Sequence, residues 1–152
     1  MGMIQNECVY HPLPVRDTFR IKLLICILLI LGVVVIFGRV GAYEFIRYDD
    51  ELYVTKNPHV LSGLNAGSLT WAFTAFEAGN WHPLTWISLM LDQELYGLDA
   101  GGYHWTNVTL HALNGLLLFA VFCRMTGKLW TSGLLAGLFL THPLHVESVA
   151  WV

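Results

Sequence analysis

The chain has 152 residues, of which 55% are hydrophobic and only 12% are charged, and its net charge is −3. Soluble domains carry about 25% charged residues, so this composition excludes an ordinary soluble enzyme and indicates a membrane protein. The few basic residues form no cluster, which excludes a nucleic-acid-binding surface. Because Cys8, Cys26 and Cys123 show no metal-ligand spacing, we expect neither a disulfide bond nor a zinc site.

The first long apolar run covers residues 21–37 and follows a basic stretch that contains Arg16, Arg20 and Lys22. The run is long enough for one membrane crossing, so we predict a cytoplasmic tail at 1–20 and a transmembrane helix at 21–42. A secretory signal peptide is the alternative, because residues 40–42 resemble a cleavage site. We favour a retained anchor, since the leading tail is long and further apolar segments follow.

Residues 43–102 form a long segment rich in aromatic residues, which we predict to be extracytoplasmic and to have a structure of its own. Asn65 is suited to cap a first helix at about 65–76. Pro83 fits the first turn of a second helix at about 84–96. Both helices are too short to cross a bilayer and are rich in aromatic residues, so we predict that they lie in the membrane interface. The alternative is a small soluble subdomain packed on the spans.

Two further apolar stretches complete the chain. We predict a transmembrane helix at 103–125 and a shorter one at 129–142, with residues 143–152 beginning a second outer loop. Arg124 and Lys128 flank the turn between these helices. Because basic residues mark the cytoplasmic side, this turn and the N-terminus are expected in the cytoplasm. The predicted fold is therefore an all-α membrane protein with about three transmembrane helices and a long outer loop that bears two interfacial helices.

A polar stripe runs along the predicted helix at 103–125 and contains His104, Asn107, His111 and Asn114. These residues are three or four positions apart, so they share one helix face, which should point into the bundle or a wet cavity. For His111 and Asn114 we favour hydrogen bonds between helices. His104 lies nearer the outer surface, where a structural role and a functional role are both open.

Asp49 and Asp50 lie just beyond the outer end of the first span. Acidic residues are costly near hydrocarbon, so this placement suggests a site, while a solvated acidic loop is the ordinary alternative. A carboxylate at the membrane surface is suited to act as a general base on a lipid-linked substrate. The pair is therefore the first catalytic candidate in the chain.

Further ionisable residues fall on the predicted outer face. A His-Pro-Leu sequence occurs at residues 82–84 and again at 142–144, where His145 and Glu147 follow it. Together with His104, these side chains could bind a phosphate or a divalent metal, or carry a proton. Their spacing fixes no coordination geometry. We therefore predict no metal site and no certain cofactor, with a divalent metal as the one cofactor left open.

Several sequence blocks resemble, in the same order, the membrane domain of the transmembrane, tetratricopeptide-repeat-containing protein O-mannosyltransferases and their bacterial relatives. The resemblance covers about residues 43–152, most of the chain. The blocks that carry it are Tyr48-Asp49-Asp50, Tyr53-Val54, Asn57-Pro58, Trp71-Ala72-Phe73-Thr74, Asn80-Trp81-His82-Pro83-Leu84-Thr85-Trp86 and His142-Pro143-Leu144-His145-Val146-Glu147-Ser148-Val149-Ala150-Trp151.

This resemblance implies a GT-C fold that moves a sugar, such as the hexose mannose, from a polyprenyl or dolichyl phosphate to an acceptor at the outer face. The acceptor would be a protein hydroxyl or a glycan. By analogy, Asp49 or Asp50 is the general base, and Asp49 is our first choice. The candidates to bind the donor or the acceptor are then His82, His104, His142, His145 and Glu147.

The family pattern continues with more spans and a helical repeat array, whereas no repeat of about 34 residues is visible here. We therefore expect a fragment or a truncated product that is inactive alone. The alternative function is a non-catalytic membrane scaffold or a protein that binds lipid-linked sugars. The expected location is a bacterial inner membrane, or the endoplasmic reticulum membrane in a eukaryote.

Overall fold

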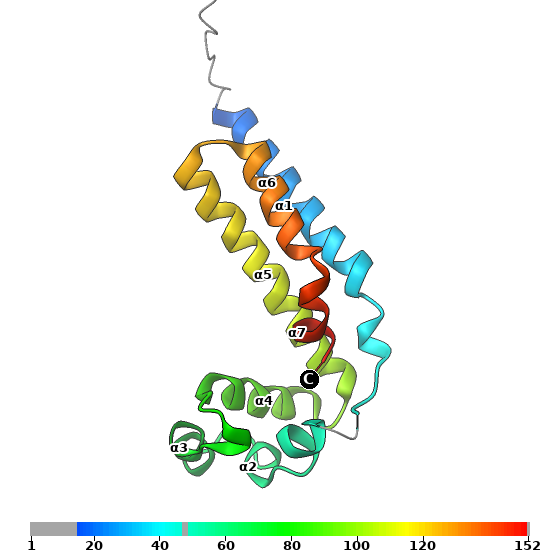
Figure 1. Ribbon diagram of the computed structural model, residues 1–152, viewed down its shortest axis with the longest axis vertical. Helices are drawn as coiled ribbons and strands as arrows, with labels where there is room; N and C mark the ends of the chain where they lie inside the picture. The colour runs from blue at the N-terminus through cyan, green and yellow to red at the C-terminus, as the bar shows by residue number, and fades with distance from the viewer. Residues whose placement is uncertain (1–14, 47–48, 152) are drawn as a thin grey trace, which may run out of the picture.

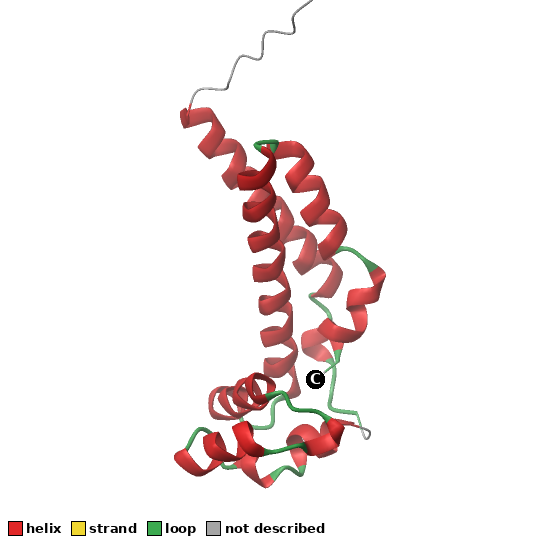
Figure 2. Cartoon of the chain, turned by 60° about the vertical axis from the view of Figure 1, so that its left-hand side comes forward, coloured by secondary structure: helices red, strands yellow, loops and turns green. Residues whose placement is uncertain are grey.

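The structure is a computed structural model, which describes residues 15–46 and 49–151. Every regular element in these two ranges is helical and none is a strand (Figure 2), which confirms the predicted all-α class. Helices α1 (Val15–Phe37), α5 (Ala100–Thr126) and α6 (Leu129–Leu140) lie side by side as a bundle (Figure 1). The other described helices gather at one end of this bundle (Figure 1).

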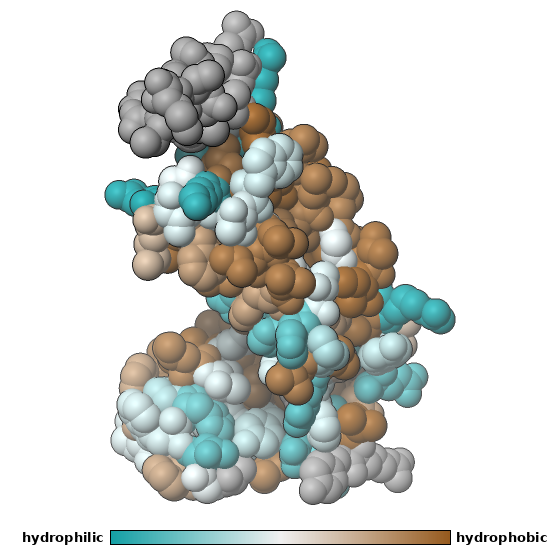
Figure 3. All heavy atoms as spheres, turned by 45° about the horizontal axis from the view of Figure 1, so that its top comes forward, coloured by the Kyte–Doolittle hydropathy of each residue, from teal (hydrophilic) through white to brown (hydrophobic). Residues whose placement is uncertain are grey.

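Two helical segments are long and apolar enough to cross a membrane, namely Thr18–Ala42 and Ala100–Thr126. The apolar helix α6 is shorter, so a third crossing remains a prediction. Much of the bundle surface is hydrophobic (Figure 3), and a continuous apolar surface of this kind is typical of a segment surrounded by lipid. These features are consistent with a membrane location.

The core of the bundle contains residues spaced one helical turn apart. Four buried residues of α1 form one side of this core: Ile25, Leu29, Val33 and Phe37. Helices α5 and α6 approach closely at Gly115, because a Cβ atom there would lie 2.4 Å from Cδ2 of Leu140. Small residues at such contacts allow membrane helices to pack tightly.

One member of the polar stripe on α5 links two helices of the bundle. The Nε2 atom of His111 lies 3.0 Å from the backbone oxygen of Leu140 on α6, so the predicted hydrogen bond between helices is confirmed for this residue. Asn114 is instead exposed on the bundle surface and contributes nothing to this contact. Along the stripe, His104 and His111 are buried, Asn107 is half-buried and Asn114 is exposed, so the stripe does not lie wholly in the core.

The segment between α1 and α5 folds into a series of short helices. Local capping explains where two of them begin, because Asn57 accepts hydrogen bonds from two backbone N–H groups of α2 and Asn65 accepts one from Ser68. Gly97, with φ of 61°, follows the last helix. The elements are η1 (Val40–Ala42), η2 (Glu51–Thr55), α2 (Pro58–Leu61), α3 (Ala66–Thr74), η3 (Glu77–Gly79) and α4 (Pro83–Tyr96).

The helices between α1 and α5 are called the outer helices below, after their predicted side of the membrane. They have a core of their own around Trp86, whose side chain is completely buried. The indole ring stacks on Tyr53 with centroids 5.0 Å apart and contacts Trp71 at 4.9 Å. Tyr103 of α5 also belongs to this core, so it joins the outer helices to the bundle. The remaining buried members are Val54, Val60, Ala72, Leu89 and Met90. The placement of these helices in a membrane interface remains a prediction.

The chain after α6 continues alongside α5 through η4 (Pro143–His145) and α7 (Val146–Ala150) (Figure 1). The side-chain amide of Asn107 on α5 donates a 2.6 Å hydrogen bond to the backbone oxygen of Trp151. Val149 is buried in the bundle core. These contacts hold α7 against the end of the bundle that faces the outer helices (Figure 1).

The loop that carries Asp49 and Asp50, called the acidic loop below, begins at η1, whose backbone lies in close contact with α5. A Cβ atom on Gly101 would lie 2.6 Å from the backbone oxygen of Gly41, and one on Gly41 would lie 2.4 Å from Nε1 of Trp105. Only residues without a side chain allow η1 and α5 to approach so closely. The segment that leads to Asp49 and Asp50 therefore leaves the bundle at a fixed point.

Candidate functional site

Two of the cavities where the bundle meets the outer helices are lined by predicted site residues. The larger has a volume of about 630 Å³ and lies between η2, α4, α5 and α7. The smaller has a volume of about 400 Å³ and lies between the η1 segment, α5 and α7. Trp151 borders both cavities. Figure 3 shows the molecule hollowed between the outer helices and the bundle.

The larger cavity combines carboxylates with aromatic rings and neutral polar groups. Its three carboxylates are Asp49, Asp92 and Glu147, and its rings are Tyr53, Tyr103 and Trp151. Among the described residues that line it, none is a lysine or an arginine. Carboxylates accept hydrogen bonds from hydroxyl groups and repel anions, so this lining is suited to a polyhydroxylated neutral group rather than to a phosphate.

The two neighbouring aspartates point to different places. Asp49 is exposed and borders the larger cavity. Asp50 is only 1% exposed and borders the smaller cavity. One carboxylate oxygen of Asp50 accepts a 2.7 Å hydrogen bond from the backbone N–H of Ile46, and its Oδ1 atom is buried without a hydrogen-bond partner. Each cavity therefore receives one member of the acidic pair.

Two of the predicted binding residues join the aspartates at these cavities. His104 is buried in the second turn of α5 and borders the smaller cavity together with Asp50. Glu147 of α7 borders the larger cavity together with Asp49. Each cavity thus pairs a residue of the acidic loop with a residue at least 50 positions later in the chain.

His82 lies behind the wall of the larger cavity rather than in it. Its imidazole ring stacks on Tyr53 with centroids 5.7 Å apart and contacts Trp86 at 4.9 Å. Because Tyr53 borders the larger cavity, His82 supports that ring from behind. The buried Nε2 atom of His82 has no hydrogen-bond partner.

His142 and His145 lie near the end of α6, away from the lining of both cavities. The Nδ1 atom of His142 accepts a hydrogen bond from the backbone N–H of Leu144, so His142 caps the start of η4. The ring of His145 contacts Phe139 at 4.5 Å and His111 at 5.3 Å. The structure therefore does not gather all seven predicted site residues into one constellation.

Asp92 of α4 borders the larger cavity, although its position in the sequence did not single it out. It is 3% exposed, and the hydroxyl of Thr106 on α5 donates a 2.6 Å hydrogen bond to its Oδ1 atom. Burial raises the pKa of Asp92 above the usual value of 3.8, and the hydrogen bond from Thr106 opposes part of this rise. A signal was present, because Thr85, Ser88 and Asp92 share one face of α4.

Replacing Asp92 with asparagine should change how stability depends on pH. A carboxyl whose pKa is raised by folding favours the folded state when protonated, and this contribution is lost as pH rises through the raised pKa. The unfolding free energy of the wild type, relative to Asp92→Asn, should therefore fall as pH rises from about 4 toward neutrality. Chemical denaturation in detergent at several pH values measures this difference.

Glu77 provides the control for this measurement, because it is exposed in the segment before α4. The variant Glu77→Gln removes the same charge without removing a buried carboxyl. A difference between wild type and Asp92→Asn that stays constant with pH, or one that Glu77→Gln reproduces, would contradict the burial of Asp92.

No metal centre is formed by the part of the chain that the structure describes. Across residues 15–46 and 49–151, no three side chains of histidine, cysteine, aspartate or glutamate are placed to hold one ion. Asp49, Asp92 and Glu147 therefore border one cavity without forming a group of metal ligands.

Comparison with known proteins finds partial matches to protein O-mannosyltransferases. The chain is 31% identical to Protein O-mannosyl-transferase Tmtc1 of Drosophila melanogaster over 112 residues, which make up 68% of this chain and 13% of that protein. It is 30% identical to Protein O-mannosyl-transferase tmtc2 of Xenopus laevis over 131 residues, or 80% of this chain and 15% of that protein. These matches support a relationship to the protein O-mannosyltransferases.

The similarity to the O-mannosyltransferases is partial. Protein O-mannosyl-transferase TMTC2 of Homo sapiens is 36% identical over 75 residues, which are 48% of this chain and 9% of that protein. The aligned part thus spans less than a sixth of the length of each of these relatives. No family model and no solved structure matches the chain.

Proposed function

We propose that this chain forms part of a membrane glycosyltransferase of the GT-C type, which transfers mannose to a hydroxyl group of an acceptor protein or glycan. The donor is a polyprenyl or dolichyl phosphate that carries the sugar, and the reaction takes place at the outer face of a bacterial inner membrane or of the endoplasmic reticulum membrane. The observation that carries this proposal is the position of Asp49, which borders a carboxylate-lined cavity next to the end of a candidate span, in a chain related to O-mannosyltransferases.

The proposed reaction is an attack of the acceptor oxygen on the anomeric carbon of the donor. A carboxylate of the acidic pair takes the proton of the acceptor hydroxyl, and the new carbon–oxygen bond forms as the bond from the anomeric carbon to the phosphate oxygen breaks. The electron pair of the broken bond stays on the lipid phosphate. Asp49 is the first candidate for the base because it is exposed at the larger cavity.

The lining of the larger cavity supports separate binding sites for the sugar and for the phosphate of the donor. Its carboxylates and rings are suited to the sugar, whereas the charge that develops on the leaving phosphate needs hydrogen-bond donors. Among the proposed residues, His82 is one candidate donor, since its ring stacks on Tyr53, which lines this cavity. His142 and His145 lie farther along the bundle and would act on the phosphate or the lipid there.

The competing proposal is a non-catalytic membrane protein that binds lipid-linked sugars or serves as a scaffold. Both proposals use the same cavity, and they differ in whether the sugar leaves the lipid. The deciding measurement incubates the full-length protein in lipid nanodiscs with radiolabelled dolichyl phosphate mannose and an acceptor protein. Transfer of label to the acceptor supports the enzyme. Binding of the donor without transfer supports the scaffold.

A further inference from the structure

Two buried histidines lie seven residues apart on α5, and only one of them has a hydrogen-bond partner. His111 is 6% exposed, and its Nε2 atom bonds to the backbone oxygen of Leu140 at 3.0 Å. His104 is 3% exposed, and both of its ring nitrogens are buried without a partner. Both rings pack edge-on against an aromatic ring, Phe37 for His111 and Tyr43 for His104.

The imidazole of His104, which is buried without a hydrogen-bond partner, destabilises the fold. A buried polar group that lacks a hydrogen bond costs free energy. An apolar side chain of similar shape would remove the cost and keep the contact with Tyr43. A polar residue within a candidate span that makes no structural bond is by default a candidate for function.

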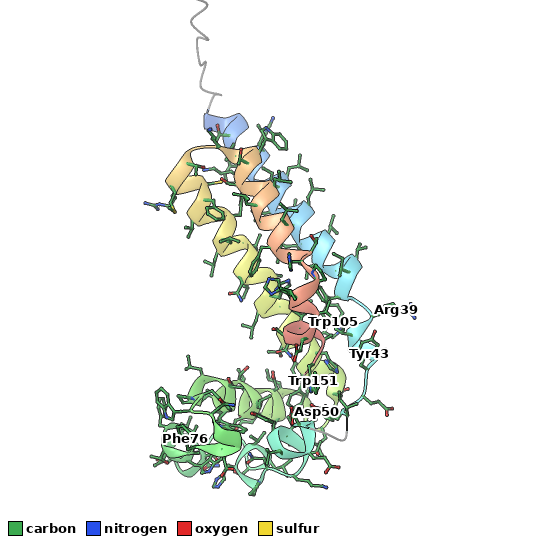
Figure 4. The ribbon with its side chains drawn as sticks, in the orientation of Figure 1. Arg39, Tyr43, Asp50, Phe76, Trp105 and Trp151 are labelled. Atoms are coloured by element: carbon green, nitrogen blue, oxygen red, sulfur yellow. The ribbon has the colours of Figure 1, made fainter. Side chains whose placement is uncertain are left out.

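Asp50, which lines the same cavity as His104, also has an unpartnered atom. Its Oδ1 atom is buried without a hydrogen-bond partner, and Asp50 and His104 both line the cavity of about 400 Å³. One water molecule occupies about 30 Å³, so this volume admits a much larger group. Figure 4 shows Tyr43, Asp50 and Trp151 grouped at this junction of the bundle with the outer helices.

The side chains that line the smaller cavity indicate which chemical group fits there. A carboxylate accepts hydrogen bonds, and a neutral imidazole offers one donor and one acceptor. A hydroxyl group satisfies both at once, because it donates to one and accepts from the other. The described lining contains a second carboxylate, Glu44, which also accepts hydrogen bonds from hydroxyl groups.

We propose that Asp50 and His104 together bind one hydroxyl group of a substrate in this smaller cavity. The inference rests on the proposed function, in which two hydroxyl-bearing groups come together: the acceptor and the sugar of the donor. If the hydroxyl belongs to the acceptor, Asp50 is the base. If it belongs to the sugar, Asp50 and His104 hold the donor and Asp49 is the base.

The experiment compares His104→Phe with the matched variant His111→Phe in the full-length protein. The thermal midpoint of unfolding is measured in detergent, and mannose transfer is measured with the acceptor varied at saturating donor and with the donor varied at saturating acceptor. We expect His104→Phe to unfold at or above the wild-type temperature, while the KM of one substrate rises about ten-fold or more. We expect His111→Phe to unfold at a lower temperature and to leave both KM values unchanged.

The two kinetic series identify the source of the hydroxyl. A higher KM for the acceptor assigns it to the acceptor, and a higher KM for dolichyl phosphate mannose assigns it to the sugar. The variant His104→Gln, which keeps a donor and an acceptor, should recover part of the loss. Lower thermal stability of His104→Phe, or unchanged kinetics in both series, would overturn the inference. Absence of transfer by the wild type would instead contradict the proposed function, and the unfolding comparison would still decide whether His104 is structural.

Discussion

Asp49→Asn is expected to lower mannose transfer about a hundred-fold or more, because general-base catalysis contributes about 10² to 10⁴ in rate. The variant keeps the size of the side chain and removes its ability to take a proton. Asp49 is exposed, so the loss should appear without a change in the unfolding temperature. Initial rates of label transfer from dolichyl phosphate mannose to the acceptor measure the effect.

Glu77→Gln is the matched control for Asp49→Asn, because Glu77 is also an exposed carboxylate of the outer segment and does not border the larger cavity. Its transfer rate should equal that of the wild type. Asp50→Asn separates the two neighbours, since asparagine can still accept the hydrogen bond from Ile46. Full activity of Asp49→Asn would exclude it as the base, and a large loss in Asp50→Asn alone would assign the role to Asp50.

Trp86→Ala should open the outer helices, at a cost of about 3–5 kcal/mol, because truncation of a buried tryptophan loses its packing and leaves a cavity. The ring is completely buried and contacts Tyr53, Trp71 and His82. Hydrogen exchange measured by mass spectrometry should show faster exchange in α3 and α4, with α1 and α6 unchanged. The bundle therefore serves as an internal reference in the same sample.

Trp81→Ala is the comparison for this loss, since Trp81 lies on the same outer segment but is 59% exposed. Its cost should stay below about 1 kcal/mol. Trp86→Phe keeps a ring in the core and removes the indole N–H, which is buried without a partner, so it should cost much less than the alanine variant. Equal exchange rates in Trp86→Ala and wild type would show that the outer helices do not depend on this core.

Features that depend on neighbouring residues could be predicted from the sequence. The apolar run of α1 and the cap at Asn65 act within one or two turns, so composition and local hydrogen bonding are enough to identify them. The polar stripe also predicted that His111 bonds to another helix, but its partner Leu140, 29 positions away, came only from the structure. These elements place the acidic loop at one end of the bundle.

The division of the site between two cavities depends on contacts between distant segments. Asp49 and Asp50 are adjacent, but η2 and the bond from Ile46 direct one outward and one inward. The sequence places Thr85, Ser88 and Asp92 on one face of α4, but only the packing of α4 on α5 shows that Thr106 meets Asp92. Histidines that occur in similar His-Pro-Leu sequences also separate, because His82 packs on Tyr53 and His142 caps η4. Sequence spacing does not show which of these residues meet across the fold.

The contact of α7 with α5 has a consequence for how the protein is made. Translation begins at the N-terminus and adds about 5–20 residues per second. The acidic loop and the outer helices therefore emerge from the ribosome before the segment that ends in Trp151. Both cavities need that segment, because Trp151 borders each of them and its backbone is bonded to Asn107. A nascent chain that has not yet passed residue 151 therefore has Asp49 and Asp92 but lacks Trp151, so neither cavity has its full lining. Both cavities are therefore complete only after the segment that follows α6 has packed on α5.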